Sequence, residues 1–210
     1  MYIGSVTISG QSFYRLGDEY VRNIDNSMLC SELFMNYMDL TAFPDLSYFE
    51  RVHYVSCNTV DCLTWGVSLP DTVRFIDFTS CNIDTPPIPN AANIYYYSIN
   101  TCPNVTTSPI FNLCPNLRTI IFAGCSALST VGAIVSCDNL AQIDFSGCAI
   151  VNSTDIDIIL SNIAANAGTY NILNGTLDLS GGTNAAPTAG ALDANYLTLL
   201  GMGWTVNINP

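Results

Sequence analysis

The sequence predicts an α/β repeat protein, a solenoid whose coils contribute their strands to one parallel β-sheet. Three observations predict this fold: a short pattern ending in Cys recurs along the middle of the chain, its spacing is nearly constant, and helix and strand signals follow it towards the C-terminus. Of the 210 residues, 49% are hydrophobic and only 10% are charged. The chain can therefore bury a large core.

The repeat is clearest where two stretches nearly coincide, since LRTIIFAGC at 117–125 returns as LAQIDFSGC at 140–148. Aligning on the final Cys extends the pattern upstream to FERVHYVSC (49–57), VRFIDFTSC (73–81) and IYYYSINTC (94–102), and downstream to a degenerate NGTLDLSGG (174–182). The final residues are Cys57, Cys81, Cys102, Cys125, Cys148 and Gly182. A regular period in the low twenties is typical of a solenoid.

Each frame has an apolar first residue, further apolar residues at +3 and +5, and Cys at +8. Successive strand residues point to opposite faces, so +3 and +5 are expected to point inward from a strand over +2 to +6. One such coil cannot bury its apolar edge alone, whereas stacked coils form a continuous core. The Cys residues at +8 are predicted to form a buried ladder of reduced thiols, with Cys114 and Cys137 on the return side of their coils.

The phasing L-x-x-L-x-L-x-x-[N/C] is that of a leucine-rich repeat. The pattern C-x-x-L-x-x-I-x-F-x-x-C-x-x-L, over about 49–152, resembles the cysteine-containing and BspA-like bacterial leucine-rich repeats. It departs from them in lacking the Pro that often follows the strand and the Ala-Phe near the end of each unit. The BspA-like relatives are largely surface adhesins, so the resemblance implies binding rather than catalysis.

From Ser153 the pattern changes to a helix over 153–168, with capping residues at its start and a Gly at its end. One or two strands with a turn at Asn174–Gly175, a second helix over 189–200 and a strand over 204–208 follow. These elements predict a β-α-β C-terminal cap. The wording LDLSGG-TNAAP-T-GWTV is similar to a C-terminal module of phage virion proteins, and this resemblance assigns no catalytic residues.

The predicted organisation has three parts: an N-terminal cap or docking segment (1–45), the leucine-rich-repeat solenoid (46–152), and a C-terminal capping module that continues it (153–210). The first part has only faint repeat character. Its best candidate for a worn first coil is 35–46.

Charge and cysteine usage limit the partners. The net charge is -12, with 17 acidic and 5 basic residues, which disfavours nucleic acid and anionic membrane surfaces. No apolar run is long enough to span a membrane, and the N-terminal residues do not resemble a signal peptide. Nine cysteines without such a signal are expected to fold in a reducing cytoplasm.

Catalytic and metal-binding patterns are absent from the sequence: it has one His, His53, and no CxxC pair or DxDxDG loop. We therefore expect no metal, no cofactor and no enzymatic activity. Asp77, Asp144 and Asp178 recur at +4 and are interpreted as a solvated strand face. Paired catalytic carboxylates, as in an enzyme acting on glycans, remain an alternative.

Residues at +2, +4 and +6 of each frame are expected to tile the concave face of the sheet. Phe75, Tyr96 and Ile121 would form an apolar centre rimmed by polar groups, as in a protein interface. The alternative is that these exposed side chains only pack on their neighbours. The candidate binding residues are Arg51, His53, Phe75, Asp77, Tyr96, Ser98, Asn100, Thr119, Ile121, Gln142, Asp144 and Asp178.

These observations predict a non-enzymatic structural or interaction protein. The favoured assignment is a phage virion component, such as a tail, fibre or capsid-associated subunit, assembled in the host cytoplasm. Its partners would be other virion subunits or a host surface receptor, and the sequence leaves open whether it also forms a homo-oligomer. The alternative is a BspA-like adhesin on a bacterial cell surface.

Overall fold

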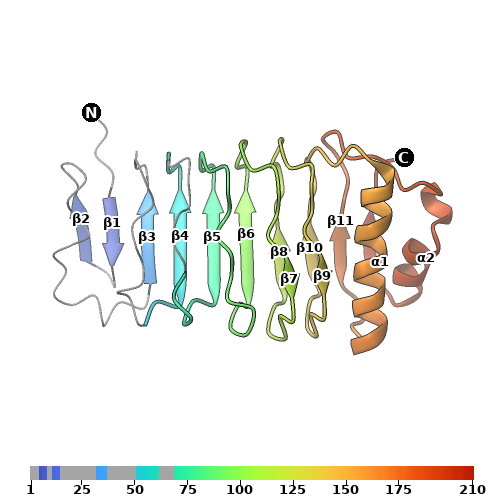
Figure 1. The fold of residues 1–210 in the computed structure, drawn as a ribbon, viewed down its shortest axis with the longest axis horizontal. Helices are drawn as coiled ribbons and strands as arrows, with labels where there is room; N and C mark the ends of the chain where they lie inside the picture. Colours follow the sequence, from blue (N-terminus) through green and yellow to red (C-terminus); the bar gives the residue numbers. More distant parts are fainter. Residues whose placement is uncertain (1–4, 9–10, 15–31, 37–50, 62–68) are drawn as a thin grey trace.

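The computed structural model describes residues 5–8, 11–14, 32–36, 51–61 and 69–210. The chain forms an elongated solenoid with a parallel β-sheet along one side and two helices near the C-terminal end (Figure 1). This confirms the predicted repeat architecture.

Within the described residues, the main sheet has ten strands in the order β12-β11-β10-β8-β6-β5-β4-β3-β1-β2. Their bounds are β1 Ser5–Ile8, β2 Gln11–Tyr14, β3 Glu32–Asn36, β4 Tyr54–Asn58, β5 Phe75–Thr79, β6 Tyr96–Asn100, β8 Thr119–Ile121, β10 Gln142–Asp144, β11 Thr176–Asp178 and β12 Thr205–Asn207. All pairs from β3 to β12 are parallel, whereas β1 is antiparallel to β2 and β3. On the return side, β7 (Phe111–Asn112) pairs in parallel with β9 (Ile134–Val135).

The strands lie where the repeat places them. β5 and β6 occupy +2 to +6 of their frames, and β8, β10 and β11 begin at +2 of theirs. The +3 and +5 side chains, such as Ile76, Phe78 and Phe122, are buried. Neighbouring Phe122 and Phe145 rings stack with centroids 5.7 Å apart, so the core is continuous from coil to coil.

The predicted frame of the first coil is wrong by three residues. Tyr54 pairs with Phe75 and Cys57 with Phe78, so Cys57 occupies +5 rather than +8. Val60, 2% exposed, takes the +8 place. The error arose because a Cys three residues early, preceded by apolar residues, imitates the end of a frame.

The segment 1–45 contributes to the same sheet. β3, at Glu32–Asn36, is parallel to β4, with Leu33 and Met35 buried beside Val55 and Cys57. The predicted degenerate first coil at 35–46 lies outside the described residues except for Met35 and Asn36, which are the last two residues of β3.

The chain turns in the left-handed conformation at +7 of each coil. This residue is Thr59, Ser80 or Thr101 in the coils of β4 to β6, with φ between 50° and 54°, and Gly124, Gly147 or Gly181 in the following coils, with φ of 69° to 76°. Only Gly adopts this region without steric cost. In the coils of β4 to β10 the side chain after the turn is buried in the core, whereas in the coil of β11 the residue after the turn is Gly182.

The cysteines form two buried ladders. Cys81, Cys102, Cys125 and Cys148 lie at the strand ends, and Cys114 and Cys137 lie on the return side; all are free thiols. The Cys148 thiol donates to the Phe122 carbonyl of the preceding coil, at 3.1 Å. This geometry confirms the predicted ladder for the last four strand-end cysteines.

Both ladders end in an asparagine. In the coil of β11, the buried Asn184 amide donates to the Phe145 carbonyl at 2.8 Å and accepts from Ile150 N–H at 3.0 Å. On the return side, Asn166 donates to the Ile134 carbonyl and accepts from Cys137 N–H. An amide replaces a thiol at the end of each ladder because it satisfies both a carbonyl and an N–H group.

Helix α1 (Ser153–Tyr170) packs on β9, and α2 (Ala194–Gly201) packs on α1 and β12. The N-cap of α1 is Asn152, whose side chain accepts from Thr154 N–H, and the helix ends at Asn171 in the left-handed conformation. The sequence predicted Ser153 or Thr154 as the cap and an end at Gly168. A short 3-10 turn, Gly190–Leu192, precedes α2, which is capped by Asp193.

Candidate docking face

The outward side of the main sheet is the candidate docking face. In register, Tyr54, Phe75, Tyr96, Thr119, Gln142 and Thr176 form one row across the strands. The next row is Phe34, Ser56, Asp77, Ser98, Ile121, Asp144 and Asp178. Most of these side chains are half-buried, so they line the surface without joining the core.

The register places ten of the twelve candidate residues on this face. They are Phe75, Asp77, Tyr96, Ser98, Asn100, Thr119, Ile121, Gln142, Asp144 and Asp178. Phe75 and Tyr96 lie opposite each other, and Ile121 lies opposite Ser98. Ser98, 3% exposed, and Thr119, 9% exposed, are shielded by larger neighbours and offer little surface to a partner.

Arg51 and His53 do not lie on the strand, because the predicted frame was shifted. Both are exposed residues that precede β4, and the His53 Nδ1 atom lies 3.1 Å from the Thr72 carbonyl oxygen. The strand positions that they were expected to fill belong to Tyr54 and Ser56.

Four aromatic rings form a continuous line across the strands, which we call the aromatic stripe: Phe34, Tyr54, Phe75 and Tyr95. Successive ring centroids are 5.4, 6.1 and 5.4 Å apart, with interplanar angles of 46° to 49°. These are favourable tilted ring contacts. Tyr95 is 37% exposed, and the other three rings are half-buried.

A polar contact anchors the middle of the stripe. The Tyr54 hydroxyl donates to a carboxylate oxygen of Asp77 at 3.3 Å. Burial, and next the negative charge of Asp77, raise the pKa of Tyr54 above its ordinary value. The Tyr54 hydroxyl therefore remains protonated and available as a donor to Asp77.

Asp144 and Asp178 lie opposite each other at the ends of β10 and β11, and each accepts hydrogen bonds from residues that follow its strand. Asp144 accepts from Ser146 N–H at 2.8 Å, and Asp178 accepts from Ser180 N–H at 2.9 Å and from the Asn207 amide at 2.9 Å. Burial alone would raise the pKa of Asp178, but its hydrogen bonds from Ser180 and Asn207 outweigh that effect and lower it. An ionised, fully bonded carboxylate suits a structural role better than proton transfer.

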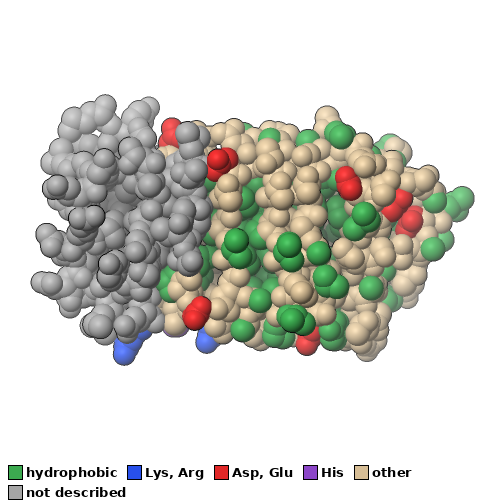
Figure 2. Space-filling view, in the orientation of Figure 1, with side chains coloured by type: hydrophobic (Ala, Val, Ile, Leu, Met, Phe, Trp, Pro, Cys, Tyr) green, Lys and Arg blue, Asp and Glu red, His purple; other side chains and the backbone are tan. Residues whose placement is uncertain are grey.

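The three described arginines lie at the edge of the sheet where the strands β4, β5 and β8 begin. Arg51, Arg74 and Arg118 are all exposed there, just before β4, β5 and β8. In Figure 2 the blue side chains lie along the lower edge, the edge at which the strands of Figure 1 start. The Arg118 guanidinium lies 5.2 Å from the centre of the Tyr95 ring, within range of a cation–π contact.

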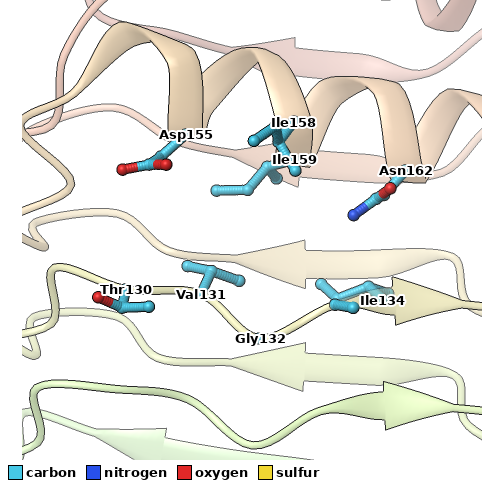
Figure 3. A pocket seen from close by; sticks show the side chains of 9 residues that line it. Thr130, Val131, Gly132, Ile134, Asp155, Ile158, Ile159 and Asn162 are labelled. Carbon is cyan, nitrogen blue, oxygen red and sulfur yellow. The ribbon is translucent and has the colours of Figure 1, made fainter.

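A small pocket of about 160 Å³ lies between α1 and the return coil that leads into β9. Figure 3 shows Asp155, Ile158, Ile159 and Asn162 of α1 above Thr130, Val131, Gly132 and Ile134. Its lining is mainly apolar. The volume suits a single side chain rather than a substrate.

Among the described residues, no group of three or more His, Cys, Asp or Glu side chains is arranged to hold a metal ion. No described helix is long and apolar enough to cross a membrane. Comparison of the chain with protein-family models, with curated proteins and with solved structures finds no match.

Sequence reasoning missed three of the four rings of the aromatic stripe, and the arginine beside it. Tyr54 was hidden by the shifted frame, and Phe34 lies in a coil that was not recognised. Tyr95 and Arg118 occupy +1, a position not assigned to any face. The alternation of Leu33 and Met35 was the available signal for the missing coil.

Proposed function

We propose that the chain is a non-enzymatic structural and interaction protein that docks through the outward face of its parallel sheet. The observation that carries this proposal is the aromatic stripe, a linear set of half-buried and exposed rings on an otherwise polar face. Aromatic side chains dominate the binding energy of protein surfaces. Phe75 belongs to this stripe, and Tyr96 lies opposite Phe75 on the neighbouring strand.

The proposed solenoid type is the leucine-rich repeat. The period, the strand at +2 to +6 and the inward residue at +8 support it, as does the use of an Asn amide, Asn184, in the slot of the last coil. The C-terminal module is proposed to cap the solenoid. Leu199 and Trp204 are buried there, which supports a role in covering the last coils.

The proposed setting is a phage particle, in which the chain would bind other virion proteins or a host surface receptor. The resemblance of the C-terminal module to virion proteins supports this setting. The six cysteines of the two ladders are buried thiols, which suits folding in a reducing cytoplasm. A BspA-like adhesin on a bacterial surface is the alternative that the repeat resemblance supports.

Two experiments test this proposal. Mass spectrometry of purified particles should find the chain at a constant copy number; its absence from particles, with display on the bacterial surface, would replace the virion assignment with the adhesin. Particles carrying Phe75→Ala or Tyr96→Ala should adsorb to host cells or assemble less efficiently than those carrying Tyr170→Ala. Tyr170 is an exposed aromatic residue of α1, away from the sheet. Unchanged assembly and adsorption for both face variants would rule out the docking face.

A further inference from the structure

The edge where the strands begin carries a column of side chains in register: His53, Arg74, Tyr95 and Arg118. Backbone hydrogen bonds join them, because Arg74 N–H donates to the His53 carbonyl, Tyr95 N–H to the Arg74 carbonyl and Arg118 N–H to the Tyr95 carbonyl, at 2.8 to 2.9 Å. Their side chains therefore leave the sheet side by side, one from each coil.

The two arginines of this column are unpaired. Within the part of the chain that the structure describes, Arg74 and Arg118 form no ion pair and no side-chain hydrogen bond. Arg118 makes a cation–π contact with the Tyr95 ring. This is unusual in a chain with 17 acidic and 5 basic residues, where carboxylates are abundant. A guanidinium presents a planar fork of donors that fits a carboxylate, so the column is suited to an anionic group from outside.

The column and the aromatic stripe meet at Tyr95. From Arg118 the line continues through Tyr95, Phe75 and Tyr54, so one path joins a guanidinium to apolar rings. Beside the path lies the hydrogen-bonding side chain of Asp77, which accepts from the Tyr54 hydroxyl. The surface thus offers positive charge, flat apolar area and polar groups along one direction.

A linear acidic glycan matches this combination. The C–H faces of its sugar rings can lie on the aromatic rings, its carboxylates can bind the arginines, and its hydroxyl groups can donate to Asp77. An extended peptide would match less well, because the backbone groups inside the sheet are already paired between strands and leave the peptide backbone without partners. The repulsion from a net charge of -12 is screened beyond about 8 to 10 Å at physiological salt, so the local arginines dominate at contact.

We infer that the column and the aromatic stripe form a binding site for a linear polysaccharide carrying carboxylates. This inference rests on the proposed docking face and names the chemistry of its partner. It requires contact between the ligand and the face, and no bond of the glycan is broken.

Isothermal titration of the full chain with galacturonate, mannuronate and glucuronate oligosaccharides tests the inference. At least one of these oligosaccharides should bind. Its carboxyl-reduced neutral form should bind at least about tenfold more weakly, because it loses the charge-assisted hydrogen bonds to the arginines. Added salt should also weaken binding of the acidic form, because it screens the attraction between the charges. Arg118→Gln and Tyr95→Ala should each reduce affinity by about tenfold. Tyr170→Ala is the matched control, since Tyr170 and Tyr95 are both 37% exposed.

Three results would overturn the inference: no binding of any acidic oligosaccharide, equal binding of the neutral forms, or an equal loss in Tyr170→Ala. Tighter binding of a poly-glutamate peptide than of any glycan would overturn it too and would assign the arginines to an acidic protein segment. If no glycan binds while Phe75→Ala still impairs adsorption or assembly, the docking face stands and only its assignment to a glycan fails.

Discussion

The two halves of the sheet have the same backbone register but different side chains. In the coils of β4 to β6 the left-handed corner is Thr59, Ser80 or Thr101, and the outward face is aromatic. In the coils of β8, β10 and β11 the corner is Gly, and the face is mainly polar, with Asp144 and Asp178 bonded to their own turns. The strained corners therefore occur in the half that we propose to bind a partner.

The difference shows which features the fold requires and which it does not. Both halves bury their +3 and +5 residues, so burial is a requirement of the solenoid. A non-Gly corner costs about 1 to 2 kcal/mol, and the solenoid tolerates three of them in succession. These costs are partly offset by side-chain hydrogen bonds. The Thr59 hydroxyl donates to the Asn58 side chain at 2.9 Å, and the Ser80 and Thr101 hydroxyls are 3.0 Å apart. The face residues are free to vary, since they contribute less to the core.

The largest expected effect lies at the end of the polar half. Asn184→Ala removes the partners of Phe145 and Leu179 carbonyls and of Ile150 N–H, all in a buried site. We expect a loss of about 2 to 4 kcal/mol in the free energy of unfolding, measured with urea. Asn139→Ala, which removes one bond from an exposed side chain, should lose about 1 kcal/mol or less. Similar losses in both variants would contradict the role of Asn184.

A threonine in place of a glycine corner should cost somewhat less. Gly147→Thr imposes the strain that Thr101 already carries, and a Cβ there would meet Gly124 Cα at an ordinary 3.4 Å. Conformational strain alone should destabilise the protein by about 1 to 3 kcal/mol. A change below about 0.5 kcal/mol in urea unfolding would show that the corners of the two halves are not equivalent.

The reverse change should stabilise the aromatic half. Thr101→Gly removes the penalty of a β-branched residue at φ 50° and loses one exposed hydrogen bond to Ser80. The free energy of unfolding should rise by about 0.5 to 1 kcal/mol. Thr106→Gly, at a site without positive φ, should instead lower it by a similar amount. Destabilisation by Thr101→Gly would mean that this corner is not strained.

Ionisation of the Cys125 and Cys148 thiols should lower stability only at alkaline pH. Burial raises the pKa of Cys125 from 9.0 to about 11 and that of Cys148 to about 12. When the pKa of a thiol is higher in the folded than in the unfolded state, its contribution to stability is fully present below pH 9. This contribution is lost as the pH rises through the pKa of the folded state. Thermal unfolding should therefore show stability falling between about pH 9 and 12, and falling less in Cys125→Ala. At neutral pH, rapid labelling of the native thiols would contradict their burial.

The sequence predicted the coils wherever a Cys at +8 marked the frame, as in those of Cys81, Cys102, Cys125 and Cys148. It misplaced the first frame because Cys57 is equally suited to the +5 slot of a core. It did not identify Asn184, since the degenerate last frame ended at Gly182 and the slot is filled from two residues further on. A local sequence pattern cannot show that a side chain two residues further along the chain fills the position that Cys fills in the other coils.

The face was predicted better than its chemistry. Alternation along a strand is enough to place Phe75, Asp77 and Tyr96 outward. The aromatic stripe crosses the strands obliquely and takes Tyr95 from a +1 position, so it depends on the stacking of one coil on the next. That Arg74 and Arg118 have no acidic partner among the described residues is likewise a property of three-dimensional neighbours.

The central claim is that the aromatic half of the sheet is the docking face. Hydroxyl-radical footprinting of the free chain and of particles adsorbed to host cells tests it without knowledge of the partner. We expect oxidation of Tyr54, Tyr95 and Phe75 by hydroxyl radicals to be slower in the adsorbed particles than in the free chain, while Tyr170 on α1 keeps its reactivity. Protection of Tyr170 with unchanged reactivity of Tyr95 and Phe75 would contradict it.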